Sequence, residues 1–382
     1  MRHIAWLAIL AACTPTTPSG SVADEAKAPL GDASVSARAV GLPGAQGASR
    51  GFVSIEPVDT CPEALTGWTG PETVVVTPPQ GTWDAFEDAQ VVRLAAAGCD
   101  VIATLDDPDE ALSTGFAFDD DGTITWAGLM LRTVQTDSAL WVVSNTTTTA
   151  WRVDLDTAEV QRVDALDRPV SGITSDGNGG AWAVLMATSN MQTNETIAPF
   201  AVVQLDADLQ TIGTPIILDS LSMGTGFASI DDDNNLIDRF LATDITVDGQ
   251  GAVWVTHSLD GVLLRIADGA VTDSVDLGVP YPTGLAWLDE RPVIASGALW
   301  DGEMLLEPPS LWSVDDLAQA PTPWTALDAP DAGFDVYSGF ETLTEAGRTS
   351  MAGWFDLEST EDGTVLVADP RGARVMTVQD NE

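Results

Sequence analysis

The feature of this sequence that most limits its fold is a hairpin pattern that recurs along the chain. Each copy has two short strands of alternating apolar residues, a turn between them, and a bulky residue at a fixed place in the second strand. The copies are 134–143 (VQTDSALWVV), 173–184 (ITSDGNGGAWAV), 245–256 (ITVDGQGAVWVT), 357–368 (LESTEDGTVLVA) and a degenerate one at 284–296. Period-two alternation buries one face of a strand, and Asp-Gly supplies the positive φ of a tight turn. The sequence therefore predicts an all-β fold.

The spacing of the copies predicts a β-propeller. Further strands are expected after the hairpins, for example at 201–205 and 262–266, which gives about four antiparallel strands in about forty residues, the size of one blade. Some bulky residues are separated by the length of one such blade: Trp141 from Trp182, and Trp254 from Ile294. Others are much farther apart: Trp182 from Trp254, and Ile294 from Leu366. Two blades therefore carry insertions, at 220–242 and 328–353. Because the link from an outer strand to the next inner strand always emerges on one face, both insertions are expected on that face.

Two copies also carry a family resemblance. The pattern Asp-Gly-x-Gly-x-x-Trp-x at 176–183 and 248–255, with a basic residue near the end of the following strand in VLLRI, resembles six-bladed propellers of the NHL-repeat, SMP-30 (gluconolactonase) and streptogramin-lyase type. The likeness runs from Arg132 to the end of the chain. We expect six four-stranded blades, with residues 52–131 supplying the sixth blade and the closing strand. A ring of seven blades is the alternative.

The first fifty residues are expected to be a targeting segment and a linker rather than a folded domain. Leu10-Ala11-Ala12-Cys13 follows a short apolar stretch and resembles a bacterial lipobox, in which Cys13 is lipidated and residues 1–12 are a signal peptide. An ordinary secretory signal or a misassigned start codon is the alternative. Residues 13–50, rich in Pro, Ser, Ala and Gly, are expected to be a flexible tether, and 51–382 the propeller. The expected location is the bacterial cell envelope, outside the cytoplasm.

The cysteines agree with export. Apart from Cys13, the chain has two, Cys61 and Cys99. In an oxidising compartment they are expected to form a disulfide. Two unpaired cysteines are the alternative.

Charge excludes several classes of function. The chain has 58 acidic and 15 basic side chains, a net charge of −43. Such a polyanion does not bind nucleic acid through phosphate contacts or an anionic membrane by electrostatics, so contact with a membrane is expected through the lipid anchor only. A hydrophobic content of 45% argues against disorder. The single lysine, Lys27, and abundant aspartate predict a protein that works in high salt or with divalent ions.

One histidine is a candidate catalytic residue. His257 follows the Trp254 strand, near the place where a loop would line the axial channel. The resemblance to streptogramin lyases implies a catalytic histidine there or in a neighbouring blade, together with a magnesium site. The matching positions in other blades are Asn145 and Leu185, so a loop histidine without a catalytic role is the alternative.

An acidic run supplies candidate metal ligands. Asp231, Asp233 and Asn235 alternate as in a loop that wraps calcium, although the glycine and glutamate of an EF-hand are missing. With Asp244, they are the residues that could hold Ca²⁺ or another divalent cation. A solvated acidic loop is the alternative.

Three hypotheses of function follow. The first is a lipid-anchored, non-enzymatic propeller that binds an unknown protein, glycan or small ligand on its loop face. The second is a metal-dependent hydrolase or lyase of the SMP-30 or streptogramin-lyase type, with its site at the mouth of the axial channel. The third is a structural component of an envelope assembly.

Overall fold

The structure is a computed structural model. The residues that it describes are 34–36, 73–77, 80–82, 85–95, 98–106, 116–118, 124–127, 131–145, 147–164, 166–190, 196–222, 228–230, 235–238, 243–279, 282–300, 305–307, 309–327, 340–344, 347–352, 355–359, 363–369 and 374–379. They form strands and turns, with no helix among them. Within these ranges there is accordingly no helix long and apolar enough to cross a membrane.

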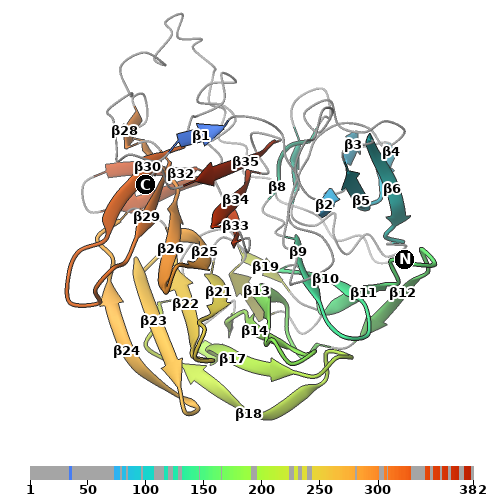
Figure 1. Cartoon of the computed structure of the whole chain (residues 1–382), viewed down its shortest axis with the longest axis horizontal. Coiled ribbons are helices and arrows are strands. Elements are labelled where there is room, and N and C mark those ends of the chain that lie inside the picture. Colours follow the sequence, from blue (N-terminus) through green and yellow to red (C-terminus); the bar gives the residue numbers. More distant parts are fainter. Residues whose placement is uncertain are drawn as a thin grey trace, which may run out of the picture.

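Five antiparallel sheets of four strands are built in the same way (Figure 1). In each, the first strand lies nearest the axis. Their strands are β9 (Leu131–Gln135), β10 (Leu140–Ser144), β11 (Thr149–Val153) and β12 (Val160–Asp164); β13 (Val170–Ser175), β14 (Ala181–Leu185), β17 (Phe200–Leu205) and β18 (Thr211–Leu218); β21 (Thr243–Val247), β22 (Val253–His257), β23 (Val262–Ala267) and β24 (Ala270–Asp276); β25 (Pro282–Leu288), β26 (Arg291–Ser296), β29 (Ser310–Ser313) and β30 (Thr322–Ala326); and β33 (Asp356–Ser359), β34 (Thr364–Asp369), β35 (Arg374–Gln379) and β1 (Ser34–Ser36).

The first strands of these sheets stand side by side around one axis. β13 contacts β9 and β21, and β25 contacts β21 and β33. A further sheet of three strands, β2 (Thr73–Thr77), β5 (Gln90–Ala95) and β6 (Gly98–Thr104), lies next to β9. Consecutive sheets that share an axis through their inner strands define a β-propeller. The predicted fold class is therefore confirmed.

The last sheet is completed by a strand from the beginning of the chain. β1 pairs antiparallel with β35, with Val35 opposite Val378. The sequence predicts that residues 52–131 supply the closing strand, whereas the structure places Ser34–Ser36 there. β1 belongs to the segment predicted as a tether, so part of that segment forms the edge of a sheet. This pairing joins the two ends of the described chain.

Smaller sheets, which we call accessory sheets, are attached to alternate blades. One has the order β16-β15-β20-β19 and another β28-β27-β32-β31, while β3-β4 and β7-β8 are separate hairpins. Their strands are β3 (Gln80–Thr82), β4 (Ala85–Glu87), β7 (Phe116–Phe118), β8 (Ile124–Ala127), β15 (Thr188–Asn190), β16 (Thr196–Ala198), β19 (Ala228–Ile230), β20 (Asn235–Asp238), β27 (Ala298–Trp300), β28 (Leu305–Glu307), β31 (Phe340–Thr344) and β32 (Gly347–Ala352).

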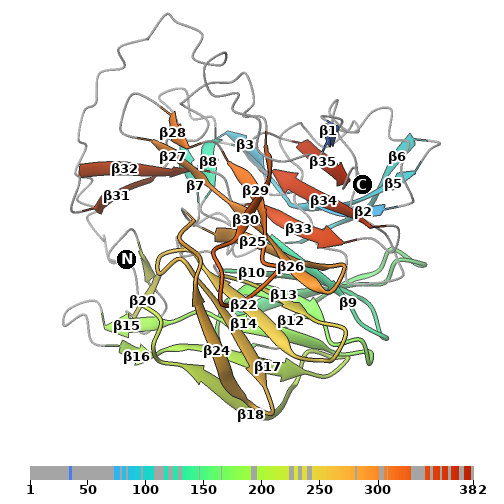
Figure 2. The same ribbon diagram turned by 60° about the vertical axis from the view of Figure 1, so that its left-hand side comes forward.

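Both four-stranded accessory sheets lie on the same face of the propeller. Each takes one hairpin from the link between the second and third strands of a blade, and the other from the link between the fourth strand and the next inner strand. In an antiparallel sheet these two kinds of link emerge at the same end. Figure 2 shows β15, β16 and β20, and above them β27, β28, β31 and β32, on one side of the inner strands. We call this side the accessory face.

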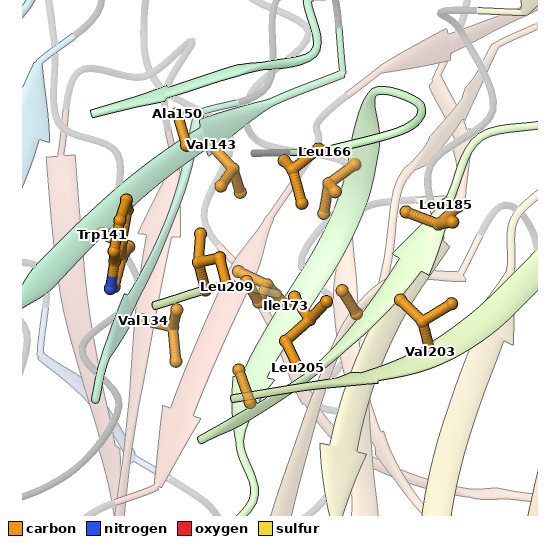
Figure 3. Close-up of a cluster of buried hydrophobic side chains, with 13 residues drawn as sticks. Val134, Trp141, Val143, Ala150, Leu166, Ile173, Leu185, Val203, Leu205 and Leu209 are labelled. Atoms are coloured by element: carbon orange, nitrogen blue, oxygen red, sulfur yellow. The ribbon is translucent and has the colours of Figure 1, made fainter. Parts of the chain in front are cut away.

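The core lies between neighbouring blades. One cluster joins the sheets of β9 and β13, where Trp141, Val143 and Ile173 pack against Leu205 and Leu209 (Figure 3). These side chains lie on strand faces that meet the neighbouring blade, and the other face of such strands is buried too, since all five residues of β10 are buried. Each fully buried aliphatic side chain contributes roughly 1.5–3 kcal/mol of transfer free energy. The predicted bulky positions therefore form packing between blades.

The hairpin turns owe their shape to aspartate as well as to glycine. Asp248 Oδ1 accepts the backbone N–H groups of Gln250 and Ala252 at 2.9 and 2.8 Å, and its Oδ2 accepts the indole N–H of Trp254 at 3.0 Å. The positive φ, 84°, belongs to Gly251. The glycine that follows the aspartate, Gly249, does not have it. The aspartate thus fixes the turn and orients the bulky residue of the second strand.

Candidate functional site

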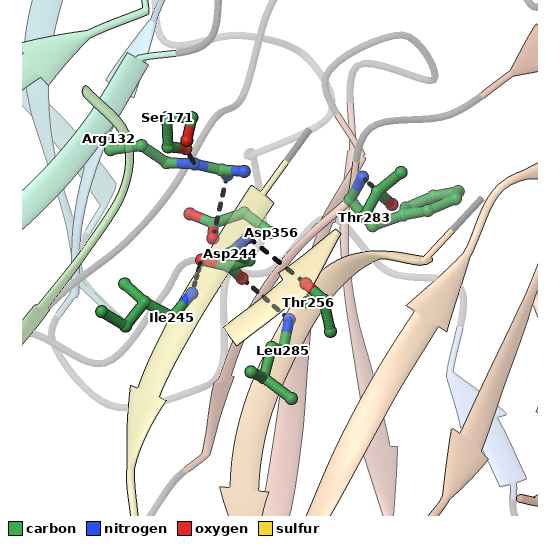
Figure 4. A network of polar contacts seen from close by, with 9 residues as sticks. Arg132, Ser171, Asp244, Ile245, Thr256, Thr283, Leu285 and Asp356 are labelled. Atoms are coloured by element: carbon green, nitrogen blue, oxygen red, sulfur yellow. Dashed lines mark hydrogen bonds and ion pairs between the residues drawn. The ribbon is translucent and has the colours of Figure 1, made fainter. Parts of the chain in front are cut away.

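Three buried charges lie where inner strands begin at the accessory face. Arg132, Asp244 and Asp356 are the second residue of β9, the second of β21 and the first of β33. We call them the axial triad. Arg132 is 1% exposed, and both aspartates are 0% exposed. Figure 4 shows that the three side chains come together from their separate strands.

Arg132 joins three blades. Its Nη1 lies 3.0 Å from Asp356 Oδ1 on β33, and its Nε donates a hydrogen bond of 3.1 Å to the Ser171 carbonyl on β13. A buried ion pair is a poor source of net stability, but removing one partner leaves an uncompensated charge in the interior. Arg132 therefore fixes the relative positions of β9, β13 and β33 at the accessory face.

The side chain of Asp244 accepts hydrogen bonds from the backbone. Its Oδ1 accepts the N–H of Ile245 at 2.8 Å, and its Oδ2 accepts the N–H of Leu285 on β25, also at 2.8 Å. Hydrogen bonds from two backbone amides stabilise this buried carboxylate. The residue predicted as a metal ligand thus joins two inner strands.

The inner strands approach one another closely at the triad. A Cβ atom on Gly172 would lie 3.0 Å from the carbonyl oxygen of Thr243, and one on Gly284 would lie 2.8 Å from that of Phe355. Beside these glycines, the hydroxyl groups of Ser171 and Thr243 form a short hydrogen bond. Only glycine allows this spacing, which brings the backbone of one blade against the next.

Beyond the triad, described residues of the inner strands line a small cavity. Thr174, Thr246 and Glu358 line a cavity of about 30 Å³ together with Ala286, Leu357 and Ser359. This volume is about that of one water molecule in the liquid. A ligand of drug size needs a site about ten times larger. This cavity, as lined by described residues, is therefore too small for a ligand of that size.

His257 is buried at the end of β22. Its Nδ1 lies 3.1 Å from Asp260 Oδ2 and 3.2 Å from the Asp260 backbone nitrogen. Nδ1 accepts the Asp260 backbone N–H when it carries a lone pair, and donates to the carboxylate when it carries a proton. The edge of the His257 ring faces Phe200, with ring centroids 5.2 Å apart. The other ring nitrogen, Nε2, has no hydrogen-bond partner among the described residues.

Asp260 ties His257 to an accessory sheet. The hydrogen bond from the His257 side chain holds the pKa of the Asp260 carboxyl well below its ordinary value, against the effect of burial. The backbone N–H of Ser222, in the link that leads to β19, also donates to Asp260 Oδ2, at 2.7 Å. The pair therefore connects a blade with the base of the neighbouring insertion.

In the first blade the residue equivalent to His257 is Ser144, not Asn145 as the sequence predicts, and it caps a turn without a histidine. Ser144 ends β10 opposite Leu131, as His257 ends β22 opposite Thr243. The Ser144 hydroxyl accepts the N–H of Thr147, three residues later, at 3.3 Å. His257 receives the N–H three residues later in the same way, or replaces it with the carboxylate. This likeness favours a turn-capping role for His257.

The other predicted site residues are not placed together. Cys13, Cys61, Asp231 and Asp233 lie outside the described residues. Cys99 is in β6 and Asn235 in β20, and only their backbone is described. Asp244 and His257 are described and lie on neighbouring strands of one sheet. The part of the chain that the structure describes contains no group of three His, Cys, Asp or Glu side chains arranged to hold a metal ion.

Arg132 and Asp356 escaped the sequence analysis. Their signal was present, because each pairs with the residue two places after a bulky marker: Val143 after Trp141, and Ala368 after Leu366. Asp244 stands in the same place opposite Thr256. Comparing that position across the hairpin copies would have found the triad.

Comparison with solved structures gives distant likenesses. The structure of a streptogramin B lyase has 12% identity over 79% of this chain and 93% of that chain, with a TM-score of 0.41. Virginiamycin B lyase from Staphylococcus aureus has 12% identity over 76% and 88%, with a TM-score of 0.40. The periplasmic gluconolactonase of Pseudomonas aeruginosa has 11% identity over 78% and 76%, with a TM-score of 0.36. No protein-family model and no curated protein matches the sequence.

The class of this protein follows from its own geometry. Sheets that share an axis through their inner strands, and that are closed by a strand from the other end of the chain, make it a β-propeller.

Proposed function

We propose that the chain is an exported β-propeller, held at the cell envelope by a lipid on Cys13, that binds its ligand on the accessory face. The observation that carries this proposal is the growth of both four-stranded accessory sheets from that face. Loops and insertions on a rigid scaffold are where propellers place recognition. The ligand class is a protein, a glycan or a small molecule outside the cytoplasm.

The axis supports binding on the face rather than chemistry in a channel. Arg132 and Asp356 of the axial triad form an ion pair, and Asp244 accepts two backbone N–H groups. The described cavity beyond them has a volume of about 30 Å³. We also infer that the ring has six blades. Five of them are the four-stranded sheets, and the sixth is the sheet of β2, β5 and β6, which lies beside β9.

Selective blocking of one face tests this function. Ile197, on β16, is 53% exposed on the accessory face, and Gln250 is exposed in a turn at the opposite end of its blade. Each is changed to cysteine and coupled to a bulky polyethylene glycol maleimide. Both variants also carry Cys13→Ser, so that no lipid holds them, and binding of the purified chain to envelopes isolated from its own cells is then measured. Coupling at Ile197→Cys should abolish binding and coupling at Gln250→Cys should not. Equal effects at both positions would argue against the proposal.

The anchor has a separate test. A Cys13→Ser chain should lose incorporation of an alkyne-labelled fatty acid and leave the membrane fraction. Retention of the label in Cys13→Ser would show that the lipid is elsewhere.

A metal-dependent hydrolase or lyase is the second candidate, and one observation favours it. His257 Nε2 is buried and has no hydrogen-bond partner among the described residues, as a general base or ligand would before substrate binds. Metal analysis of the purified chain decides between the candidates. A stoichiometric divalent ion that disappears in Asp244→Asn would support the enzyme. The geometry of Asp244 predicts no such loss.

A further inference from the structure

The strands of this chain recur in pairs of blades. The inner strands β9, β21 and β33 begin at Leu131, Thr243 and Asp356, so that the same element returns at a nearly constant interval. The intervening inner strands β13 and β25 begin at Val170 and Pro282, which are separated by the same interval. The accessory hairpins follow this period closely, because β15 and β27 begin at positions 188 and 298. A blade with an accessory sheet therefore alternates with a plain blade.

Contacts recur with the same period as the strands. The register of β13 with β14 shifts between Val170 and Gly172, and that of β25 with β26 shifts between Pro282 and Gly284. Each glycine then lies against the start of the next inner strand. The two blades therefore share a bulge, a glycine and its contact at the same place.

The axial triad is one position seen in three copies. Arg132, Asp244 and Asp356 each pair with the residue two places after the bulky marker of the next strand. One copy has arginine and two have aspartate, so the two kinds of charge meet at the axis. The ion pair between Arg132 and Asp356 depends on this difference between copies.

The beginning of the described chain fits a third copy. β5, β7 and β8 begin at positions 90, 116 and 124, and β17, β19 and β20 begin at positions 200, 228 and 235. The interval between corresponding strands is nearly the same in all three cases, and it matches the interval between the later copies. The hairpin β3-β4 stands before β5 as β15-β16 stands before β17. β3 also lies against β8, as β15 lies against β20, although β3-β4 and β7-β8 are separate two-stranded sheets.

We propose that the chain is three tandem copies of one two-blade unit, each as long as the stretch from the start of β9 to the start of β21, and that the accessory face carries three equivalent accessory sheets, one on every second blade. The first of these has the strand order β4-β3-β8-β7, with Thr82 opposite Ile124, as Asn190 is opposite Asn235 in the second. Calling the surface a binding face rests on the proposed function. The construction of the face does not, because it needs no ligand.

For recognition, the consequence is an accessory face with three similar accessory sheets around one axis. A partner that binds one accessory sheet meets the next at high effective concentration, so each further contact adds to its affinity. The three accessory sheets have different sequences. They therefore share a backbone arrangement and present different side chains.

Cysteine pairs in the full chain test the proposed sheet. Residues directly opposite in antiparallel strands have Cα atoms about 4.5–5.5 Å apart, within the range of a disulfide. Thr82→Cys with Ile124→Cys is the test pair, and Asn190→Cys with Asn235→Cys is the matched pair of the second sheet. Thr82→Cys with Ala117→Cys is the negative control, because Ala117 on β7 pairs with Trp126 on the far side of β8 and would lie about 10 Å away. Mild oxidation is followed by peptide mass spectrometry.

The expected result is a disulfide between positions 82 and 124 in the same yield as that between 190 and 235, and none between 82 and 117. A Thr82→Cys, Ile124→Cys chain that stays reduced while the matched pair is oxidised would overturn the threefold construction. So would a disulfide between positions 82 and 117, because it requires another strand order. Neither outcome depends on ligand binding, so failure here is distinct from failure of the proposed function.

Discussion

At the scale of single residues, the buried charges at the axis connect sequence with architecture. Arg132 reaches from β9 to β13 and β33, and Asp244 reaches from β21 to β25. Each side chain satisfies a partner on another blade. These contacts between blades therefore stabilise the inner strands at the accessory face, and no single blade could make them alone.

Arg132→Met should strongly destabilise the protein. It leaves the fully buried Asp356 without its ion-pair partner, at a cost of about 3–5 kcal/mol in the free energy of unfolding. Urea unfolding measures this. The matched control is Asp273→Asn, which breaks a partly exposed pair with Arg265 at 3.5 Å and should cost about 1 kcal/mol or less. Similar midpoints for the two variants would contradict the role given to Arg132.

Asp260→Asn should lower stability in a way that depends on pH. The pKa of Asp260 is lowered in the folded state, mainly by its hydrogen bond with His257. Its contribution is thus present above the unfolded pKa, near 4, and is lost as the pH falls toward the folded pKa. Because the carboxyl is partly exposed, we expect a difference of about 1 kcal/mol or less. The gap between wild type and variant at pH 5 should shrink by pH 2. A gap unchanged at pH 2 would show that the carboxylate charge is irrelevant.

At this scale, the contacts of the candidate residues could not all be predicted from the sequence. Asp244 has the chemistry of a metal ligand, and nothing local in DITVDG reveals that its oxygens face the N–H groups of Ile245 and Leu285. Leu285 is far along the chain and becomes a neighbour only when the blades pack. His257 was found as an isolated histidine, and its partner Asp260, three residues later, was available from the sequence.

At the scale of strands, local pattern was a good guide. The short apolar strands with turns between them predicted the hairpins that became β9-β10, β13-β14, β21-β22 and β33-β34. The expectation that only one face of each strand is buried was wrong, because β10 and β22 are buried at every position. The insertions at 220–242 and 328–353 contain β19-β20 and β31-β32, but their partners β15-β16 and β27-β28 were not predicted. Those hairpins are short and lack alternation, and pairing with the insertions completes their sheets.

Gly284→Ala tests the close approach of inner strands. The added Cβ would lie 2.8 Å from the Phe355 carbonyl oxygen and 2.9 Å from Leu357 Cγ, so β25 and β33 must separate. We expect a loss of about 1–3 kcal/mol in the free energy of unfolding. Gly249→Ala is the control, because its Cβ meets nothing within 4 Å and its φ is not positive. If both variants unfold at the same urea concentration, the inner strands have more room than the structure gives them.

At the scale of the whole molecule, the sequence predicted the propeller class but not its paired construction. The long intervals from Trp182 to Trp254 and from Ile294 to Leu366 show that alternate blades are longer. The two-blade unit is visible only in the strand registers and contacts, because equivalent positions hold different residue types. Arg132, Asp244 and Asp356 are one such position.

The net charge of −43 makes stability dependent on salt. Repulsion among carboxylates opposes the compact state, and salt screens it, with a Debye length of about 10 Å at 0.1 M and about 3 Å at 1 M. The melting temperature should rise as sodium chloride is raised from 0.05 to 1 M and then level off. A melting temperature independent of salt would show that the acidic surface is not a source of strain.

The central claim is that the accessory face is the face that binds. A photo-crosslinking amino acid placed at Ile197 on that face, and at Gln250 on the opposite face, tests it in cells that carry the protein. The account predicts a discrete crosslinked product from position 197 and none from position 250. Products from position 250 alone, or equal products from both positions, would contradict it.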